Sequence, residues 1–167
     1  MARLATVLHE AAAAVIPAPF GCVAIETDGH CITALRFVEH AAASDPTSDL
    51  AARAADQLTR YFSNPGTDFD LPLAVRGTPF QRRVWSAISA IPTGETRRYG
   101  DLAEALDAPP RSVGQACGDN RLPIVIPCHR VIATNGLGGF AHATGGFEIA
   151  VKRWLLEHEG ALRGSLL

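Results

Sequence analysis

The sequence predicts an α+β fold in two parts, a small unit of antiparallel strands and one helix over residues 1–76 and a mainly helical unit over residues 77–167. Three observations predict this division. Two apolar runs near the N-terminus flank a turn with a glycine, helical spacing of apolar residues dominates after Gly77, and two short helical stretches there meet at a proline-rich break. The length of 167 residues suits one ordinary domain or two small ones, and a hydrophobic content of 47% is enough for a packed core.

The first part opens with a predicted β-hairpin. Residues 20–26 and 31–37 are extended, apolar runs, and Asp28-Gly29-His30 lies between them as a turn. This pattern predicts two antiparallel strands that are adjacent in both sequence and space.

A helix and a further strand complete the predicted first unit. Leu50, Ala54 and Leu58 are spaced as on one helix face, and Asn64-Pro65-Gly66 ends that helix. The apolar residues between 69 and 75 predict a short last strand before the second unit begins.

The second unit begins with a well-marked helix. Thr78 is a suitable N-cap, Pro79 suits the first helical position, and Val84, Trp85 and Ile88 form an apolar stripe. The helix is expected to end before the sequence Ile91-Pro-Thr-Gly94.

Two shorter helices follow and predict a helix-turn-helix. They cover residues 99–106 and 111–118, and Asp107-Ala-Pro-Pro110 forms the break between them. In such a motif the second helix can present its N-terminal residues to DNA. The pattern is weakly specific by itself, because many helical hairpins bind no nucleic acid.

Charge and export signals narrow the classes of function. The net charge is −2, but it divides into −4 over residues 1–76 and +2 over residues 77–167, so a polyanion should meet the second part. No apolar run is long enough to span a membrane, and the N-terminus lacks the pattern of a signal peptide. We therefore expect a soluble, cytoplasmic protein whose four cysteines are reduced thiols.

The segment from Asn120 to Ile132 carries the clearest chemical signal. A β-branched run, Ile124-Val125-Ile126, predicts a strand that delivers Cys128 next to His129. A lone buried cysteine is usually a small hydrophobic residue. A thiol has a pKa of about 8.5, however, so an adjacent imidazole is the kind of group that generates a thiolate at neutral pH.

Several motifs in this part of the chain resemble the O6-alkylguanine-DNA alkyltransferase family. The resemblance is strong over residues 77–160 and loose over residues 18–75. The matching motifs occur in the family's order and are Gly77-Thr-Pro-Phe-Gln81, Val84-Trp85, Ile91-Pro-Thr-Gly-Glu-Thr96, Tyr99-Gly100, Arg111-Ser-Val-Gly114, Asn120, Pro123, Pro127-Cys-His-Arg-Val131 and Lys152-Arg-Trp-Leu-Leu-Glu-His-Glu-Gly160. In its finer detail the resemblance implies a ribonuclease H-like α/β roll followed by a winged-helix-like domain.

The resemblance implies a single displacement by a cysteine. Cys128 would attack the alkyl carbon on O6 of guanine, and a relay through His129, a water and Glu159 would help to deprotonate it. Glu159 is favoured over Glu157 by its place in the motif alone. Asn120 would belong to the catalytic group and would also support the turn that fixes the helix-turn-helix unit against the active-site strand. The product is a stable thioether, so each molecule would act once.

The resemblance also implies how duplex DNA is bound. The target carbon lies on the pairing edge of the base, so the nucleotide must leave the stack before a thiol can reach it. Arg111 would replace the extruded base, and Tyr99 would lie beside the phosphate and help to turn the nucleotide outward. Ser112 and Gly114 are small enough to allow close approach in the minor groove.

The expected pocket for the flipped base combines residues from several segments. By resemblance it uses backbone groups near Cys128 and Val131, together with Tyr99 and a loop around Gly139 and Phe140; we add Trp85 to this group. The expected substrates are O6-alkylguanine and also O4-alkylthymine. No cofactor and no metal are implied, and the partner is double-stranded DNA bound by a monomer, with no membrane.

Three departures from the family pattern affect the site. The spacing from Tyr99 to Arg111 is two residues shorter than expected, so the turn must be tighter. Arg98 stands where a serine is common and adds charge near the expected phosphate path. Phe140 stands in place of a tyrosine, and the segment after it, residues 141–150, is longer than usual.

Other interpretations of the polar residues remain open. Cys22, His30 and Cys31 would suit a zinc site only with a second paired cluster, which the spacing lacks. His142 in the glycine-rich loop is interpreted as an exposed residue outside the site, and Cys117 as a packed residue. Two alternative functions are a DNA-binding protein that senses alkylation damage without transfer and a Cys-His hydrolase.

Overall fold

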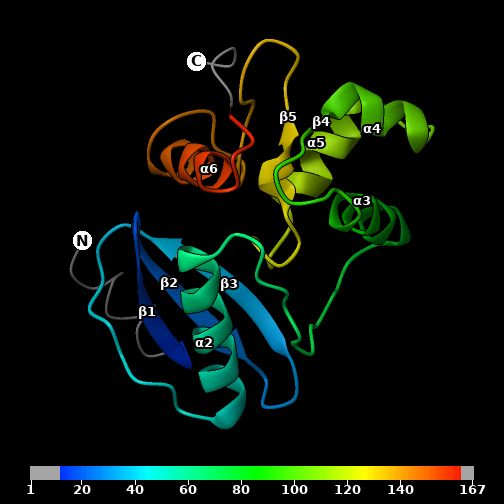
Figure 1. Cartoon of the computed structure of the whole chain (residues 1–167). Helices are drawn as coiled ribbons and strands as arrows, with labels where there is room; N and C mark the ends of the chain where they lie inside the picture. Colours follow the sequence, from blue (N-terminus) through cyan, green and yellow to red (C-terminus); the bar gives the residue numbers. More distant parts are fainter. Residues whose placement is uncertain (1–11, 163–167) are drawn as a thin grey trace. The chain divides into compact units, whose positions relative to one another are not determined.

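The computed structural model describes residues 12–162, which belong to two compact units, Met1–Val75 and Arg76–Leu167 (Figure 1). The fold is α+β, as expected, with a small antiparallel sheet and five α-helices in the described range. None of these helices is long and apolar enough to cross a membrane. The expectation about a signal peptide concerns a segment that, up to residue 11, lies outside the described residues.

Within residues 12–75, the first unit is an antiparallel sheet of three strands with one helix. The strands are β1 (Ala14–Ala18), β2 (Gly21–Thr27) and β3 (Ile32–Val38), hydrogen-bonded in that order. The predicted hairpin is confirmed, and Asp28 shapes its turn because its Oδ1 accepts hydrogen bonds from the backbone N–H groups of His30 and Cys31.

Strand β1 was not predicted, and the expected strand over residues 69–75 is wrong. Strand β1 contains Pro17, which is tolerated because β1 lies at the sheet edge. Residues 69–75 form a single bridge between Leu73 and Ile32 instead. Pro72 lacks an N–H donor and contributes only its carbonyl, which accepts from the Ile32 N–H at 2.8 Å.

Helix α2 (Asp49–Ser63) confirms the predicted helix of the first unit and packs against all three strands. The Ser48 side chain caps its N-terminus by accepting a hydrogen bond from the Ala51 N–H. Its buried face carries Ala51, Ala54, Leu58 and Tyr61, so the core of this unit lies between helix and sheet.

The second unit, as described up to residue 162, contains four α-helices and a short parallel strand pair. Its elements are α3 (Pro79–Ser89), β4 (Arg97–Arg98), α4 (Tyr99–Ala105), α5 (Pro110–Gly118), the 3-10 helix η1 (Cys128–Arg130), β5 (Val131–Ile132) and α6 (Phe147–His158). The predicted start of α3 is confirmed by a full capping box, in which Thr78 and Gln81 satisfy each other's backbone N–H groups.

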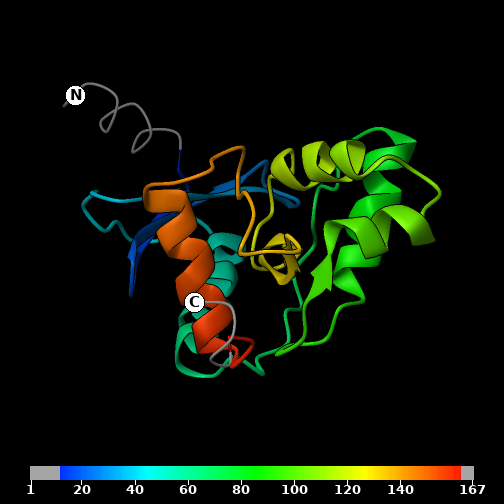
Figure 2. The ribbon, with the colours of Figure 1, turned by 90° about the horizontal axis from the view of Figure 1, so that it is seen from above.

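Helices α4 and α5 form the predicted helix-turn-helix, and α5 also packs on α3 (Figure 2). The short turn is made by a Schellman motif at the end of α4. The Ala108 N–H bonds to the Ala103 carbonyl at 2.9 Å and the Asp107 N–H to the Glu104 carbonyl at 3.2 Å, while Asp107 takes a φ of 51°. This motif makes the turn before Arg111 a tight one.

Helix α5 is fixed on the core by its buried face. Val113, Ala116 and Cys117 are buried, and the Trp85 indole of α3 donates a hydrogen bond of 2.8 Å to the Ala116 carbonyl. Because α3 holds α5 by both packing and this bond, the opposite face of α5, with Arg111 and Gln115 exposed, is held at a fixed position in the unit.

Candidate functional site

A succession of tight turns, and not the expected strand, delivers Cys128. Ile124 has a φ of 72°, which a β-branched residue rarely adopts, and the Ile126 N–H bonds to the Leu122 carbonyl at 2.8 Å. Pro127, with φ −83° and ψ 63°, lies at the centre of an inverse γ-turn that joins the Cys128 N–H to the Ile126 carbonyl. The prediction of a strand over residues 124–126 is therefore wrong, and Cys128 begins η1.

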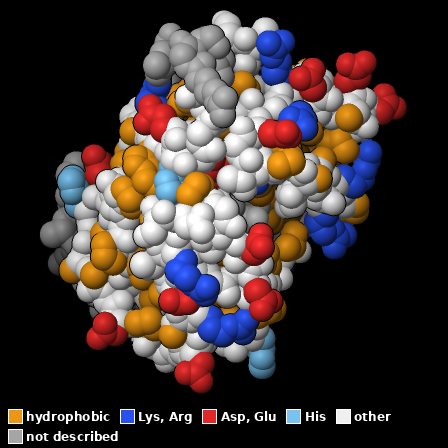
Figure 3. Space-filling view, in the orientation of Figure 1, with side chains coloured by type: hydrophobic (Ala, Val, Ile, Leu, Met, Phe, Trp, Pro, Cys, Tyr) orange, Lys and Arg blue, Asp and Glu red, His pale blue; other side chains and the backbone are white. Residues whose placement is uncertain are grey.

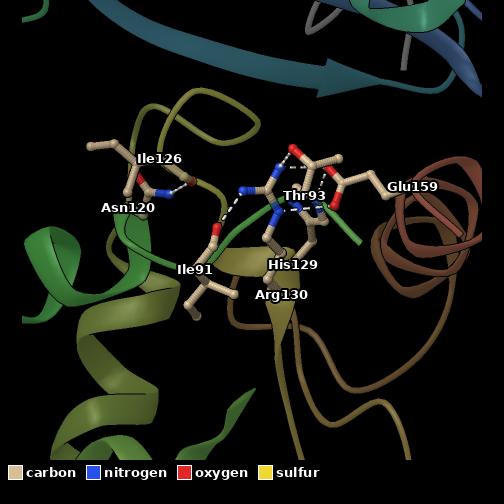
Figure 4. A network of polar contacts seen from close by, with 7 residues as sticks. All are labelled: Ile91, Thr93, Asn120, Ile126, His129, Arg130 and Glu159. Atoms are coloured by element: carbon tan, nitrogen blue, oxygen red, sulfur yellow. Dashed lines mark hydrogen bonds and ion pairs between the residues drawn. The ribbon is translucent and has the colours of Figure 1, made fainter. Parts of the chain in front are cut away.

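The Asn120 side chain stabilises these turns and fixes the position of the Cys128 thiol. Its Nδ2 donates to the Ile126 carbonyl at 2.8 Å (Figure 4) and also to the Cys128 Sγ at 3.1 Å. Its Oδ1 accepts from the Leu122 N–H at 2.9 Å. One amide side chain thus holds both the loop and the sulfur, and its donor favours the thiolate over the thiol.

Behind Cys128, a buried network joins η1 to the end of α6. His129 Nε2 lies 2.8 Å from Glu159 Oε1, and both side chains are fully buried. Arg130 donates from Nε to Glu159 Oε2 and from Nη2 to Glu159 Oε1, both at 2.9 Å. Figure 4 shows these groups converging on one carboxylate. The charge of Glu159 is therefore matched by the guanidinium, which makes its burial possible.

A helix-end motif fixes the position of Glu159, and hydrogen bonds to the loop after α3 fix that of Arg130. Glu159 is the C-cap of α6, and Gly160, with a φ of 71°, closes a Schellman motif there through the Gly160 and Ala161 N–H groups. Arg130 also donates to the Ile91 carbonyl at 2.7 Å and to Thr93 Oγ1 at 3.1 Å. The loop after α3 thereby joins the same network.

The network fixes the tautomer of His129. Glu159 accepts from Arg130 and acts as an ionised acceptor, so the hydrogen between it and His129 belongs to Nε2 of the imidazole. The lone pair then lies on Nδ1, which is the only buried side-chain nitrogen or oxygen between residues 12 and 162 without a hydrogen-bond partner. Burial lowers the pKa of His129, against the opposing effect of Glu159, so the ring is neutral and able to accept a proton.

Lys152 is a buried cation that sequence analysis assigned no role. Its Nζ donates to the Val131 carbonyl at 2.7 Å and to the Gly139 carbonyl at 2.9 Å, and it lies 5.6 Å from the centre of the Tyr99 ring. Burial lowers its pKa to about 8, while negative charge on Cys128 or Cys117 acts in the opposite direction. The ammonium is therefore placed where it favours a thiolate.

The thiol itself is held in its neutral form in the free protein. Burial raises the pKa of Cys128, and the Asn120 hydrogen bond and the Lys152 charge oppose this effect without cancelling it. Attack by this sulfur therefore requires removal of a proton during the reaction.

Cys128 opens onto a cavity of about 490 Å³ between α5 and the loop before α6. Its lining residues are Tyr99, Pro110, Arg111, Gly114, Gln115, Cys117, Gly118, Cys128 and the loop residues Gly139, Phe140, Ala141, His142, Ala143 and Thr144. The Tyr99 hydroxyl donates to the Gly139 carbonyl at 3.1 Å, and burial raises its pKa, so it stays a neutral phenol.

The structure gathers most of the residues that the sequence singled out. Cys128, Tyr99, Arg111, Gly114, Gly139 and Phe140 line the cavity, and His129, Asn120 and Glu159 form the support around the thiol. Trp85 and Val131, which were expected in the pocket, do not line it, and neither does Ser112, which was expected to contact DNA. Trp85 packs beneath α5, Val131 is buried in β5 with its carbonyl bonded to Lys152, and Ser112 lies half-buried on α5.

Four further residues belong to the site but escaped sequence analysis as functional groups. Lys152 lies on the core-facing stripe of α6 with Leu155 and Leu156. Lysine is rarely buried without a partner, so a lysine in such a stripe could have indicated a functional residue. No pattern in the sequence indicated a separate role for Arg130. Cys117 and His142 were interpreted as lying outside the site, yet both line the cavity. Burial raises the pKa of the Cys117 thiol to about 12.

The distribution of charged side chains and of potential metal ligands bears on what the protein can bind. On the face in Figure 3, Lys and Arg side chains are interspersed with Asp and Glu, so this face has no continuous basic patch. Within residues 12–162, no group of three or more His, Cys, Asp or Glu side chains is arranged to hold a metal ion.

Comparisons with known proteins agree with this geometry. A family model described as "6-O-methylguanine DNA methyltransferase, DNA binding domain" matches residues 79–161. A protein of Mycobacterium bovis named methylated-DNA–protein-cysteine methyltransferase is 42% identical over 86% of this chain and 89% of its own length. A constitutive protein of that name from Bacillus subtilis is 47% identical over 65% of each chain.

Solved structures are similar over nearly the whole chain. The crystal structure of Mycobacterium tuberculosis O6-methylguanine methyltransferase has a TM-score of 0.73 at 39% identity and covers 90% of this chain and 93% of its own. A structure of the Mycobacterium tuberculosis protein in complex with DNA has a TM-score of 0.72 at 40% identity and covers 88% and 91%.

Proposed function

The chain belongs to the O6-methylguanine DNA methyltransferase family and repairs DNA by transferring methyl groups to a protein cysteine, and from this premise we propose that the acceptor is its own Cys128. The observation that carries this proposal is the setting of the sulfur. Cys128 lines the cavity, receives a hydrogen bond from Asn120, and lies next to the His129–Glu159 pair. Cys117 lines the same cavity but lies on α5, and within residues 12–162 no group donates a hydrogen bond to its sulfur.

His129 is the base that receives the thiol proton. Its Nδ1 carries the free lone pair and its Nε2–H is held by Glu159, so the imidazolium formed by proton uptake is stabilised by a carboxylate at 2.8 Å. A single water between Sγ and Nδ1 completes the path and satisfies the buried nitrogen. Lys152 and Asn120 stabilise the sulfur anion as it forms.

The transfer is one displacement at the alkyl carbon. The Cys128 sulfur forms a bond to carbon, the carbon–O6 bond breaks, and its electron pair goes to the guanine. The thiol proton remains on His129 until solvent or the leaving base takes it. Tyr99, a neutral phenol in the cavity wall, can donate to the base only by exchanging its hydrogen bond to the Gly139 carbonyl for one to the base. The thioether is a stable product, so the protein acts once.

Duplex DNA approaches on the side of α5, in the minor groove. The alkylated base must leave the stack to reach a sulfur inside a cavity, and Arg111, exposed at the start of α5 and at the cavity edge, takes its place in the duplex. Gly114, one turn further on, allows close approach of the backbone. The same cavity serves O4-alkylthymine, whose alkyl carbon also lies on the pairing edge.

The two units divide these tasks. Residues 77–167 contain every group assigned above, as a winged-helix-like domain that binds DNA and accepts the alkyl group. Residues 1–76, a ribonuclease H-like roll, have a structural role. The protein acts as a monomer in the cytoplasm and needs no cofactor for a displacement by its own thiol.

Mass spectrometry tests the acceptor directly. The protein is incubated with duplex DNA that contains one O6-methylguanine, digested, and its cysteine peptides are weighed. We expect one added methyl on the peptide with Cys128, none in Cys128→Ala, and methyl still on Cys128 in the matched control Cys117→Ala. Methyl on the Cys117 peptide would contradict the assignment. Binding of the damaged duplex without any transfer would instead favour a damage sensor.

A further inference from the structure

A strained turn forms one wall of the cavity. The Phe140 N–H bonds to the Ala143 carbonyl at 2.9 Å, and the Ala143 N–H bonds back to the Phe140 carbonyl at 2.8 Å. Between them, Ala141 and His142 have φ values of 50° and 64°. Two consecutive left-handed residues form a type I′ turn, which normally requires Asn or Gly. This turn therefore needs contacts from outside itself to persist.

The side chain of His142 supplies those contacts. Its Nε2 lies 2.8 Å from Asp119 Oδ1, at the end of α5. The ring rests on Gly118, where a Cβ would overlap the imidazole, so only glycine at position 118 leaves room for it. The other oxygen of Asp119 accepts from Gln81 Nε2 at 2.9 Å, and Gln81 belongs to the capping box of α3. The turn is thus tied to α5 and, through Asp119, to α3.

This tie joins two opposite walls of one cavity. Helix α5 contributes Arg111, Gly114 and Cys117 to the lining, and the turn contributes residues 139–144. His142 bridges the two walls, because it lines the cavity itself while bonding to the residue that follows α5. The deep end of the turn is held separately, since the Gly139 carbonyl accepts from both Tyr99 and Lys152. Without His142 the outer end, residues 141–144, would lose its attachment to α5.

We propose that His142 is a positioning residue that limits the size of the alkyl group Cys128 can accept, by holding the 140–143 turn against α5. The inference rests on the proposed function, since it assumes that the alkyl group enters this cavity. A methyl group needs little room beyond the base itself, whereas a benzyl group must be housed by the cavity walls. A fixed turn therefore discriminates against the large group, and a released turn admits it.

The test compares two substrates in one duplex sequence. Single-turnover rates are measured with O6-methylguanine and with O6-benzylguanine for the wild type, His142→Ala and Gly118→Ala. Loss of one partly exposed hydrogen bond predicts a rise of about two- to tenfold in the benzyl-to-methyl rate ratio. His142→Ala and Gly118→Ala should both raise this rate ratio. Gly118→Ala displaces the imidazole ring of His142 although both His142 and Asp119 are still present. His142→Gln should keep a ratio near the wild type, because its amide nitrogen is as many bonds from Cβ as the imidazole Nε2 and can still donate to Asp119.

Controls separate this inference from the proposed function. His30→Ala removes a histidine from the hairpin turn of the first unit and should leave the ratio unchanged. An unchanged ratio in both His142→Ala and Gly118→Ala overturns the inference, as does an equal loss of rate with both substrates. Failure of the proposed function would look different, because the wild type would then place no methyl on Cys128.

Discussion

Replacing Lys152 with methionine tests the buried cation beside Cys128. Methionine is of similar length and keeps the apolar stem packed, but it removes the charge and the two hydrogen bonds to the Val131 and Gly139 carbonyls. The Lys152 charge lowers the pKa of Cys128, and a nearby cation lowers the pKa of an acidic group by about one to three units, so we expect alkyl transfer to slow by about ten- to a hundredfold at neutral pH.

The variant also has a defined effect on stability. Burial lowers the pKa of Lys152 from 10.5 to about 8, which corresponds to about 3 kcal/mol against the charged form in the folded protein. Between these two values the unfolded chain binds the extra proton, so this lysine makes the wild type more stable as pH rises and less stable as pH falls through 8. Lys152→Met lacks this dependence.

Urea unfolding at pH 7 and pH 9 measures the difference. The free energy of unfolding of the variant, relative to the wild type, should fall by about 1 kcal/mol between these pH values. The lost hydrogen bonds shift both measurements alike and do not affect the comparison. A difference that stays constant with pH would refute the lowered pKa of Lys152, and an unchanged transfer rate would refute its assistance to the thiolate.

Three further variants probe the support of the thiol and the tight turn. Asn120→Ala removes the hydrogen bond to Cys128 Sγ and should slow both alkyl transfer and iodoacetamide labelling of Cys128 by about tenfold; equal labelling rates would contradict this. Glu159→Gln leaves Arg130 buried without its counter-charge and should lower the free energy of unfolding by about 3 kcal/mol in urea, as well as slowing transfer; a stability equal to the wild type would argue against an ionised Glu159. Asp107→Gly relieves a φ of 51° and should raise the free energy of unfolding by about 1 kcal/mol without changing transfer, whereas a loss of stability would show that the Asp side chain supports the turn.

Local chemistry explains which elements the sequence predicted. The capping box at Thr78 and the apolar stripe of α3 involve residues within four positions of each other, so pattern alone reveals them. The same holds for the Asp28 turn and for the helix-turn-helix. Strand β1 could not be predicted from a local pattern. Pro17 is acceptable in a strand only at a sheet edge, and distant residues decide which strand lies at the edge.

The errors around the thiol have a related cause. Residues 124–126 have the composition of a strand, but Pro123 and Pro127 flank them and the Asn120 side chain captures the Ile126 carbonyl. These constraints override β propensity and force Ile124 into a left-handed conformation. The roles of Arg130 and Lys152 depend on partners 13 or more positions away, and a single sequence does not pair them.

Asn120 connects recognition of DNA with the chemistry of the thiol. It follows α5 by two residues, and α5 is fixed on α3 through the Trp85 hydrogen bond to Ala116. The same Asn120 side chain bonds the Cys128 sulfur at 3.1 Å. The helix proposed to enter the minor groove and the atom proposed to react are therefore positioned by adjacent parts of one rigid segment. Insertion of Arg111 into a duplex would then fix the distance between the vacated base position and the sulfur, so that binding itself aligns the extruded base for displacement.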